Sequence, residues 1–347
     1  MIGIKQRLLE LQEILKENSI FFSQEDEQVI KGDYIDHPWL NELLSLSTQD
    51  FFHFDGQRNY KLIADPGWQK LIEKIDTLTS FTAIERKDEL PNLLGRRKKR
   101  HELSQLSNLN ELKDHKMIYD FGGGVGNLSY FLENDLNLTP TIIEADSDLI
   151  ATGEKKMLKL NSDIKFIKHK ITPDSKINLN ANSCAIGLHT CGNFAPDMMK
   201  LCIENKLERV INFGCCYSKI ESDRYHLSSL SDKGLFLNHR ALSYATLGFS
   251  KMPEEFWHFR NKIVKYKMSY YNWVYKNYGI IEFQSMSNSR RSLYDLDFDQ
   301  FVEKTITKYA KDYSITSEEE LNTFLESKEN LKLVNYLQAY YAIARYF

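Results

Sequence analysis

The hydrophobic pattern changes twice along the chain. Up to about residue 95, apolar residues recur at three- and four-residue steps, which predicts short amphipathic helices. Between about residues 116 and 215, short apolar runs alternate with helical stretches, as in strands joined by crossover helices. After about residue 250 the helical spacing returns. The pattern therefore predicts an α/β domain at 96–250, a helical N-terminal region at 1–95 and a mostly helical C-terminal region at 251–347.

The apolar runs of the central region have the length of buried strands. Strands that alternate with helices form a parallel sheet, so this region is expected to have a Rossmann-like α/β fold. Two further strands are expected of this fold, with candidates at 235–249 and 280–286. The five runs lie at residues 117–121, 140–146, 163–169, 183–189 and 209–215.

Composition excludes a membrane protein and restricts nucleic-acid binding. The chain of 347 residues is 42% hydrophobic and 27% charged, and no apolar run approaches the roughly 20 residues that span a bilayer. The net charge of −3 means that a nucleic acid would need a local basic patch. The five cysteines crowd between Cys184 and Cys216, which is no disulfide framework. Together with an amphipathic N-terminus instead of a signal peptide, this favours a cytoplasmic protein.

The sharpest local signal is a glycine-rich turn after the first predicted strand. Residues 118–127 read Ile-Tyr-Asp-Phe-Gly-Gly-Gly-Val-Gly-Asn and lead into a helix. A dinucleotide-binding turn would place glycine at Asn127, so a nicotinamide-dependent oxidoreductase is the weaker alternative. The tight spacing favours S-adenosylmethionine, which has no phosphate, although a plain tight turn is the simplest alternative. The predicted cofactor-binding residues are Asp120, Gly122, Gly123, Gly124, Gly126 and, at the end of the next strand, Glu144.

Three motifs around this turn resemble one family. Lys98-Lys99-Arg100-His101-Glu102 precedes the first strand, Leu-His-Thr-Cys-Gly-Asn occupies 188–193, and Gly-Cys-Cys-Tyr occupies 214–217. In this order they resemble the methyltransferase-like protein 25 family. The resemblance implies a Rossmann-like class I methyltransferase fold, S-adenosylmethionine as cofactor, and a place for Lys99, His101 and His189 at the cofactor site. The chain departs from the family pattern at Val125, where lysine is usual, and at Asn193, where aspartate is usual.

Methyl transfer requires the protein to position the acceptor and, where needed, to remove its proton. The tips of the fourth and fifth strands lie at the reaction edge of this fold, which makes His189, Asn193 and Tyr217 the candidate catalytic residues. His189 is expected to act as general base or orienting donor; the alternative is a histidine bonded to a neighbouring carbonyl. Because Asn193 cannot act as a carboxylate base, an inactive relative that binds the cofactor or RNA is a second hypothesis.

The cysteines near the reaction edge are expected to serve as small buried hydrophobic residues. Neighbouring residues of a strand point to opposite faces, and the chain has no Cys-x-x-Cys pair, so no metal is predicted at Cys191, Cys215 and Cys216. Cys191 lacks the preceding proline usual in enzymes with a cysteine nucleophile, which disfavours covalent catalysis.

The motifs do not identify the methyl acceptor, but two features favour RNA over a protein or a small molecule. The basic run Arg96–Arg100 has the charge to contact phosphates, although a solvated helix start is the simpler interpretation. The Leu-His-Thr-Cys-Gly and Cys-Cys motifs also resemble transfer-RNA 2′-O-methyltransferases, which carry N-terminal zinc clusters that this chain lacks. Aromatic residues and lysines between Glu254 and Tyr278 suit either base stacking or a helical core.

Overall fold

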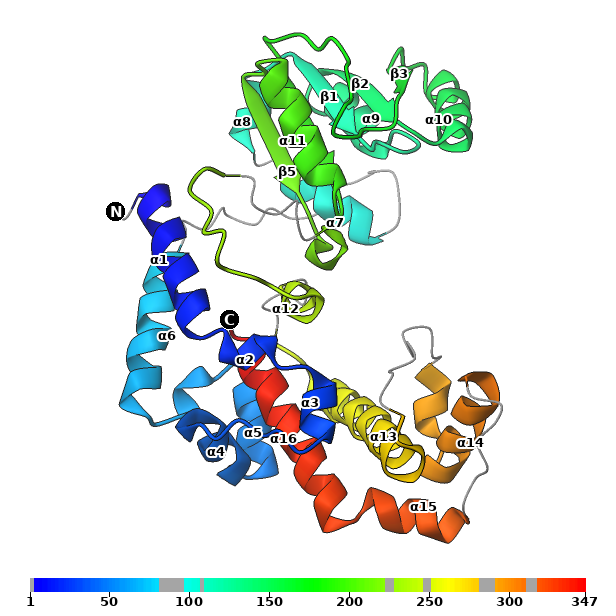
Figure 1. The fold of residues 1–347 in the computed structure, drawn as a ribbon. Coiled ribbons are helices and arrows are strands. Elements are labelled where there is room, and N and C mark those ends of the chain that lie inside the picture. Colours follow the sequence, from blue (N-terminus) through cyan, green and yellow to red (C-terminus); the bar gives the residue numbers. More distant parts are fainter. Residues whose placement is uncertain are drawn as a thin grey trace. The chain divides into compact units, whose positions relative to one another are not determined.

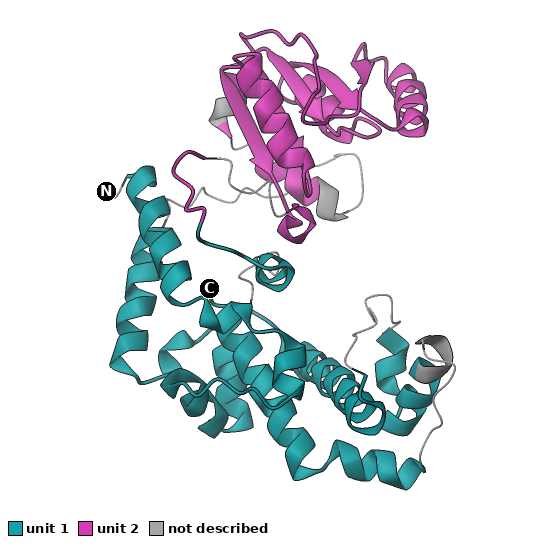
Figure 2. Cartoon of the chain, viewed as in Figure 1, with its two compact units in different colours: residues 1–79, 234–347 teal, residues 80–233 magenta. Residues whose placement is uncertain are grey.

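The chain divides into two compact units, coloured separately in Figure 2. The structure is a computed structural model that describes residues 3–80, 97–106, 109–221, 228–245, 251–280, 291–309 and 317–347, with the backbone alone at 97–99, 110–111 and 306–309. One unit, the sheet unit, comprises residues 80–233. The other, the helical unit, combines residues 1–79 with residues 234–347. Each is described by itself.

The sheet unit is built on a five-stranded parallel sheet of order β3-β2-β1-β4-β5 (Figure 1). All five predicted strands are present, and their ends lie within two residues of the predicted ends. The strands are β1 (Met117–Phe121), β2 (Thr139–Glu144), β3 (Lys165–Lys168), β4 (Cys184–Leu188) and β5 (Arg209–Phe213). The helices are α7 (Arg97–Leu106), α8 (Asn110–Lys113), α9 (Asn127–Asn134), α10 (Ser147–Lys159), α11 (Phe194–Glu204) and the short 3-10 helix η2 (Tyr217–Lys219).

Alternating side chains of the strands divide the core between the two faces of the sheet. Ile118 and Ile186 pack with leucines of α7, α8 and α9 on one face. Tyr119 and Phe121 of the same strand β1 pack against α11 on the other face. This period of two is the signature of a strand buried on both sides. The order reverses between β1 and β4, so the carboxyl ends of these two strands form the edge at which open α/β sheets bind ligands.

The helical unit has its core around the last helix, α16, which packs against α2, α3, α4, α13 and α15. Apolar and aromatic residues cover most of its circumference, including the buried Leu337 and Tyr340. The helices before the sheet are α1 (Ile4–Glu17), α2 (Ile20–Ser23), α3 (Asp26–Ile30), α4 (Pro38–Ser45), α5 (Thr48–Asp55), η1 (Tyr60–Leu62) and α6 (Pro66–Thr79). Those after it are α12 (His239–Tyr244), α13 (Glu254–Tyr278), η3 (Arg291–Asp295), α14 (Phe298–Tyr309), α15 (Glu318–Leu325) and α16 (Lys328–Ala344).

The two flanking regions of the sequence therefore share one core. The carboxylate of Asp55, 1% exposed, accepts hydrogen bonds from Arg345 at 2.6 Å, from the indole of Trp257 at 2.7 Å and from Arg260. Arg240 of α12 contacts Asp26 of α3 at 2.7 Å. The contact of Arg240 explains why the second boundary falls after residue 233 and not after residue 250. The first boundary falls after residue 79, whereas the sequence predicted it after residue 95.

Two expectations for the C-terminal flank can be compared with the structure. The candidate strand at 235–249 is wrong over residues 239–244, which form α12 and belong to the helical unit; the candidate at 280–286 lies almost entirely outside the described residues. The aromatic stripe of α13 is core, because Tyr266, Tyr270 and Trp273 are each less than 9% exposed and pack on α14 and α15. Within the described ranges, no helix has the length and apolar character needed to span a bilayer.

Candidate functional site

The glycine turn between β1 and α9 has a backbone that only glycine fits. Gly122, Gly124 and Gly126 have φ of +69°, +59° and +82°, in the left-handed region that L side chains rarely adopt. Gly123 has no room for a side chain, because a Cβ there would lie 2.7 Å from Asp120 Oδ2 and 2.9 Å from a methyl group of Ile142. At Gly124, by contrast, nothing lies within 4 Å of an added Cβ. The turn is thus tightly packed beneath and open above Gly124.

Asp120 supports this turn from below. Its carboxylate is 1% exposed and accepts a 2.7 Å hydrogen bond from the hydroxyl of Ser129 on α9. The bond ties the end of β1 to the first turns of the helix that follows. Asp120 therefore lies where it can fix the shape of the turn, while its side chain is covered by protein.

Glu144, at the end of β2, lies beside the open part of the turn. Its Oε2 accepts a hydrogen bond from the backbone N–H of Gly124 at 3.0 Å, and its Oε1 accepts from Ala145 at 2.8 Å and Asp146 at 3.0 Å. A carboxylate has about four acceptor positions, so one stays available. Glu144 is half-buried. The ends of β1 and β2 thus place an ordered carboxylate next to the backbone of Gly124.

Asn127 explains how the turn differs from a dinucleotide-binding one. It is the first residue of α9, and its amide oxygen accepts a hydrogen bond from Lys156 of α10. A third glycine, which in a dinucleotide site allows close helix packing, is replaced here by a side chain that links two helices. Burial lowers the pKa of Lys156. This arrangement agrees with a turn made for a ligand without a pyrophosphate.

His189 immediately follows β4 and contacts the helix that precedes the sheet. Its Nε2 lies 3.0 Å from Glu102 Oε1 of α7, and its own backbone N–H donates to Phe213 O at 2.9 Å. The residue has φ of +68°, which turns its side chain away from the strand direction. The side chain of His189 is 38% exposed and that of Glu102 is 19% exposed. The ring is therefore paired with a carboxylate, not with the neighbouring carbonyl that was the alternative.

The other predicted site residues have different settings. Asn193 immediately precedes α11, and its Oδ1 accepts a 2.9 Å hydrogen bond from the backbone N–H of Glu221. Tyr217 is 42% exposed at the start of η2. His101 is exposed on α7. The side chain of Lys99 lies outside the described residues. Sequence reasoning gave no role to Glu102, although it occupies a position of the quoted motif Lys98–Glu102, which was the available signal. It gave none to Ser129 either, which lies two residues beyond the quoted glycine turn.

The cysteines near the reaction edge contradict the sequence prediction. The Sγ atoms of Cys191, Cys215 and Cys216 all lie within 4.8 Å of one another, with 2.8 Å between Cys191 and Cys215 and 3.6 Å between Cys215 and Cys216. Strand alternation does not separate Cys215 from Cys216, because β5 ends at Phe213. All three are half-buried, so the description as buried hydrophobic residues is also wrong. That description fits Cys184 and Cys202, which are 0% exposed.

Hydrogen bonds within this cluster lower the pKa of one thiol and raise that of another. Burial opposes ionisation of Cys191, but hydrogen bonds that its sulfur accepts from Cys215 and Cys216 outweigh burial and lower the pKa of the Cys191 thiol. The bond to Cys191, together with burial, raises the pKa of Cys215 to about 12. In the core, burial raises the pKa of Cys184 to about 11 and that of Cys202 to about 12.

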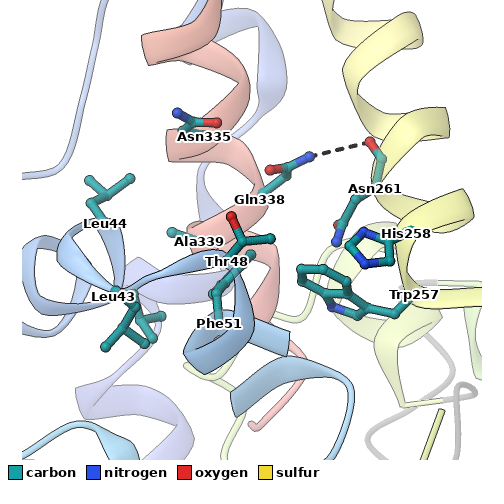
Figure 3. Close-up of a pocket in the computed structure, with 11 residues that line it drawn as sticks. Leu43, Leu44, Thr48, Phe51, Trp257, His258, Asn261, Asn335, Gln338 and Ala339 are labelled. Atoms are coloured by element: carbon teal, nitrogen blue, oxygen red, sulfur yellow. Dashed lines mark hydrogen bonds between the residues drawn. The ribbon is translucent and has the colours of Figure 1, made fainter. Parts of the chain in front are cut away.

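The helical unit contains a pocket of its own (Figure 3). It lies between α4, α5, α13 and α16, where Phe51 and Trp257 face His258, Asn261 and Gln338. The amide of Gln338 donates to the backbone oxygen of Asn261 at 3.2 Å. The volume of the pocket, about 240 Å³, is below the roughly 300–1,000 Å³ of most small-molecule sites. The glycine turn and its neighbours carry the sequence motifs and are the stronger candidate site.

Comparison with known families agrees with this choice. Residues 98–223 match a family model described as a methyltransferase domain. This segment is similar to methyltransferase domains, and S-adenosylmethionine is the cofactor that the match supports. The finer resemblance to the methyltransferase-like protein 25 family stays a prediction.

Solved structures similar to the chain include two methyltransferases. One is an S-adenosylmethionine-dependent methyltransferase from Clostridium acetobutylicum ATCC 824, with 16% identity and a TM-score of 0.28 over 44% of this chain and 59% of that one. The other is coclaurine N-methyltransferase bound to N-methylheliamine and SAH, with 12% identity and a TM-score of 0.29 over 88% of this chain and 92% of that one. Scores below 0.5 add nothing about acceptor or mechanism. No curated protein matches the chain in sequence.

Proposed function

We propose that this chain transfers a methyl group from S-adenosylmethionine bound at the carboxyl ends of β1 and β2. The observation that supports this most is the position of Glu144, whose carboxylate borders the open backbone of Gly124. A carboxylate acceptor beside a glycine turn suits the paired ribose hydroxyls of a nucleoside ligand, and the side chain of Asn127 at the third glycine position disfavours a dinucleotide. The proposed cofactor-binding residues are Gly122, Gly123, Gly124, Gly126 and Glu144, with Asp120 positioning the turn.

His189 is the proposed proton acceptor for the reaction. S-adenosylmethionine, when bound, supplies an electrophilic methyl group on a sulfonium, so the protein's task is to orient the acceptor and remove its proton. In the neutral imidazole, Nε2–H donates to Glu102, which leaves the lone pair of Nδ1 to accept a proton. Once protonated, the ring is stabilised by the same carboxylate. This pairing of a base with an orienting acid is a recurrent arrangement in catalysis.

Asn193 gives little support to the alternative of an inactive relative. Its Oδ1 serves as a hydrogen-bond acceptor for the backbone N–H of Glu221, and an aspartate oxygen would serve equally well. The contact therefore requires an acceptor and no ionisable group. With this role assigned to Asn193, the acid–base chemistry rests on His189 and Glu102, and Tyr217 is proposed to line the acceptor side.

RNA is the proposed acceptor. The basic run Arg96–Arg100 enters α7, the helix whose Glu102 contacts His189. At 1.5 Å per residue, Arg97 and Glu102 are separated by about 7–8 Å along the helix axis. The first turn of α7 contains no acidic residue, and cations at this end oppose the helix dipole. The run thus disfavours the helix and is better suited to bind an anion such as a phosphate.

Cofactor binding is tested at Gly124. We expect S-adenosylmethionine to raise the melting temperature of the chain, by mass action on the folded state, and Gly124→Arg to abolish the increase by filling the open space above the turn. Gly32→Arg is the matched control, because Gly32 has φ of +93° and equally open surroundings in the helical unit. An increase in melting temperature that survives in Gly124→Arg, or that is absent in the parent chain at millimolar ligand, contradicts the proposal.

The acceptor is tested separately with labelled methyl groups and total cellular RNA. We expect label in RNA and an affinity for RNA that falls with salt, by about 0.7 log units per log unit of salt for each single-strand phosphate neutralised. Replacing Arg96, Arg97 and Arg100 with alanine should flatten that slope while S-adenosylmethionine still binds. If the label appears in protein or in small molecules and RNA binding does not depend on salt, the acceptor is not RNA.

A further inference from the structure

Three cysteine sulfurs converge from the loops after β4 and β5, which also carry His189 and Tyr217. Cys191 follows β4, and Cys215 and Cys216 follow β5. Their Sγ atoms lie within 4.8 Å of one another. A thiol–thiol hydrogen bond needs only two of them, so the third requires a different explanation.

Contacts between the two loops hold the cluster in place. The backbone N–H of His189 donates to Phe213 O at 2.9 Å, and Thr190 Oγ1 donates to Asn212 Oδ1. Gly192, with φ of +62°, approaches so closely that an added Cβ would lie 2.7 Å from Lys219 O. Asn193 Oδ1 accepts from Glu221 N. Contacts thus join the two loops on both sides of the sulfurs and limit the motion of the loops. A ligand that binds the sulfurs therefore loses less free energy in ordering them.

The setting of the three sulfurs differs from that of the other cysteines. Cys184 and Cys202 are 0% exposed within the apolar core. Cys191, Cys215 and Cys216 are half-buried at the carboxyl edge of the sheet. A ligand from solvent can therefore reach these three and not the other two.

We propose that Cys191, Cys215 and Cys216 bind one Zn²⁺ through three thiolates and leave its fourth position open. Zn–S bonds of about 2.3 Å in a tetrahedron place sulfurs about 3.8 Å apart. The 3.6 Å between Cys215 and Cys216 agrees with this spacing, and the 2.8 Å between Cys191 and Cys215 needs to widen by about 1 Å. Soft thiolate ligands select zinc over magnesium or calcium. A disulfide between Cys191 and Cys215 would leave Cys216 without a role.

An open fourth position gives the site a chemical use. Three protein ligands with one exchangeable position are typical of zinc sites that bind a water or a substrate atom, whereas structural sites have four protein ligands. Bound zinc favours the deprotonated form of an oxygen or sulfur atom in that position. This proposal concerns the metal alone and does not depend on the acceptor of the methyltransferase domain.

The experiment is metal analysis of the full chain, expressed with added zinc and purified under reductant without a chelator. We expect about one zinc per chain, and less than a tenth of that in Cys191→Ser and in Cys215→Ser. Cys202→Ala, in the core of α11, should keep the full amount. X-ray absorption should show three sulfur neighbours at about 2.3 Å. In the parent chain, zinc should protect Cys191, Cys215 and Cys216 from alkylation, and a chelator should expose them, so the test stands even if a variant fails to fold.

Three results would overturn the proposal. The purified chain could contain no zinc and bind none when micromolar zinc is added. Folded Cys191→Ser could retain as much zinc as the parent, which would place the metal elsewhere. Mass spectrometry could instead find Cys191 and Cys215 joined as a disulfide under the same reducing conditions.

Discussion

At the scale of single residues, the site combines groups whose conformations are strongly constrained. Three glycines of the turn have positive φ, and Gly123 is excluded from carrying a side chain by Asp120 and Ile142. Glu144 is held by three backbone N–H groups, so its carboxylate is ordered before any ligand binds. A group already in place loses less entropy on binding. The effect of removing it should therefore be large and specific.

Glu144→Ala is expected to weaken S-adenosylmethionine binding about 10- to 100-fold, which corresponds to the roughly 1.5–3 kcal/mol of a hydrogen bond to a charged group. The exposed Glu154 on α10 provides the control, and Glu154→Ala should bind like the parent. Titration calorimetry measures both variants. Equal affinity of Glu144→Ala and the parent would move the ribose contact to another acceptor, with Asp146 the next candidate.

At the scale of elements, α7 connects the basic run to the reaction edge. Residues at its start are positively charged, and Glu102 in its middle contacts His189 after β4. The helix lies outside the strand–helix repeat of the sheet and packs on it through Leu103 and Leu106. Through Glu102, α7 thus connects the motif Lys98–Glu102 with the motif at 188–193 that contains His189.

Glu102→Gln should lower kcat by about 10²-fold or more, near the lower end of what general acid–base catalysis contributes. Glutamine keeps the shape but removes the charge that stabilises the protonated ring. KM for S-adenosylmethionine should change less than twofold. Glu204→Gln, at an exposed position of α11, is the control. If kcat is unchanged in steady-state assays of labelled methyl transfer, the pair has a structural role only.

The strands of the sheet were predictable because their signal is local. Residues 117–121 and 184–188 are short apolar runs whose burial needs no knowledge of distant residues. The glycine turn was predictable for the same reason. The pairing of Glu102 with His189 was not, because 87 residues separate them. The cysteine cluster was mispredicted because the two-residue period was extended past Phe213, where the strand ends.

At the scale of the whole molecule, one buried carboxylate joins distant parts of the helical unit. Asp55 ends α5, Arg260 lies on α13, and Arg345 follows α16. Burial opposes ionisation of Asp55, but the charges of Arg345 and Arg260 outweigh it and lower the pKa of the carboxyl group. Its contribution to stability is therefore present above the unfolded-state pKa of about 3.9 and is lost as the pH falls toward the folded-state value.

Asp55→Asn is expected to destabilise the helical unit by about 3–5 kcal/mol, because it leaves Arg345, whose side chain is 8% exposed, and the half-buried Arg260 without their counter-charge. All four tryptophans belong to this unit, so their fluorescence in a urea titration reports its unfolding alone. S-adenosylmethionine binding should be unchanged, and stability should depend less on pH below about 4 than in the parent. Asp33→Asn, at an exposed position, serves as control. A midpoint within error of the parent would contradict this role.

The division of the chain also sets an order of events during synthesis. Residues 1–79 leave the ribosome before the sheet domain does, but their apolar faces pack on α16, which is made more than 200 residues later. The methyltransferase domain is one uninterrupted stretch, so its core can form while those first helices still lack their partner. Domains generally fold as units as they emerge, and exposed apolar surface invites aggregation or chaperones in the meantime. The helices of residues 1–79 therefore remain without their packing partner α16 until the end of this sequence has been made.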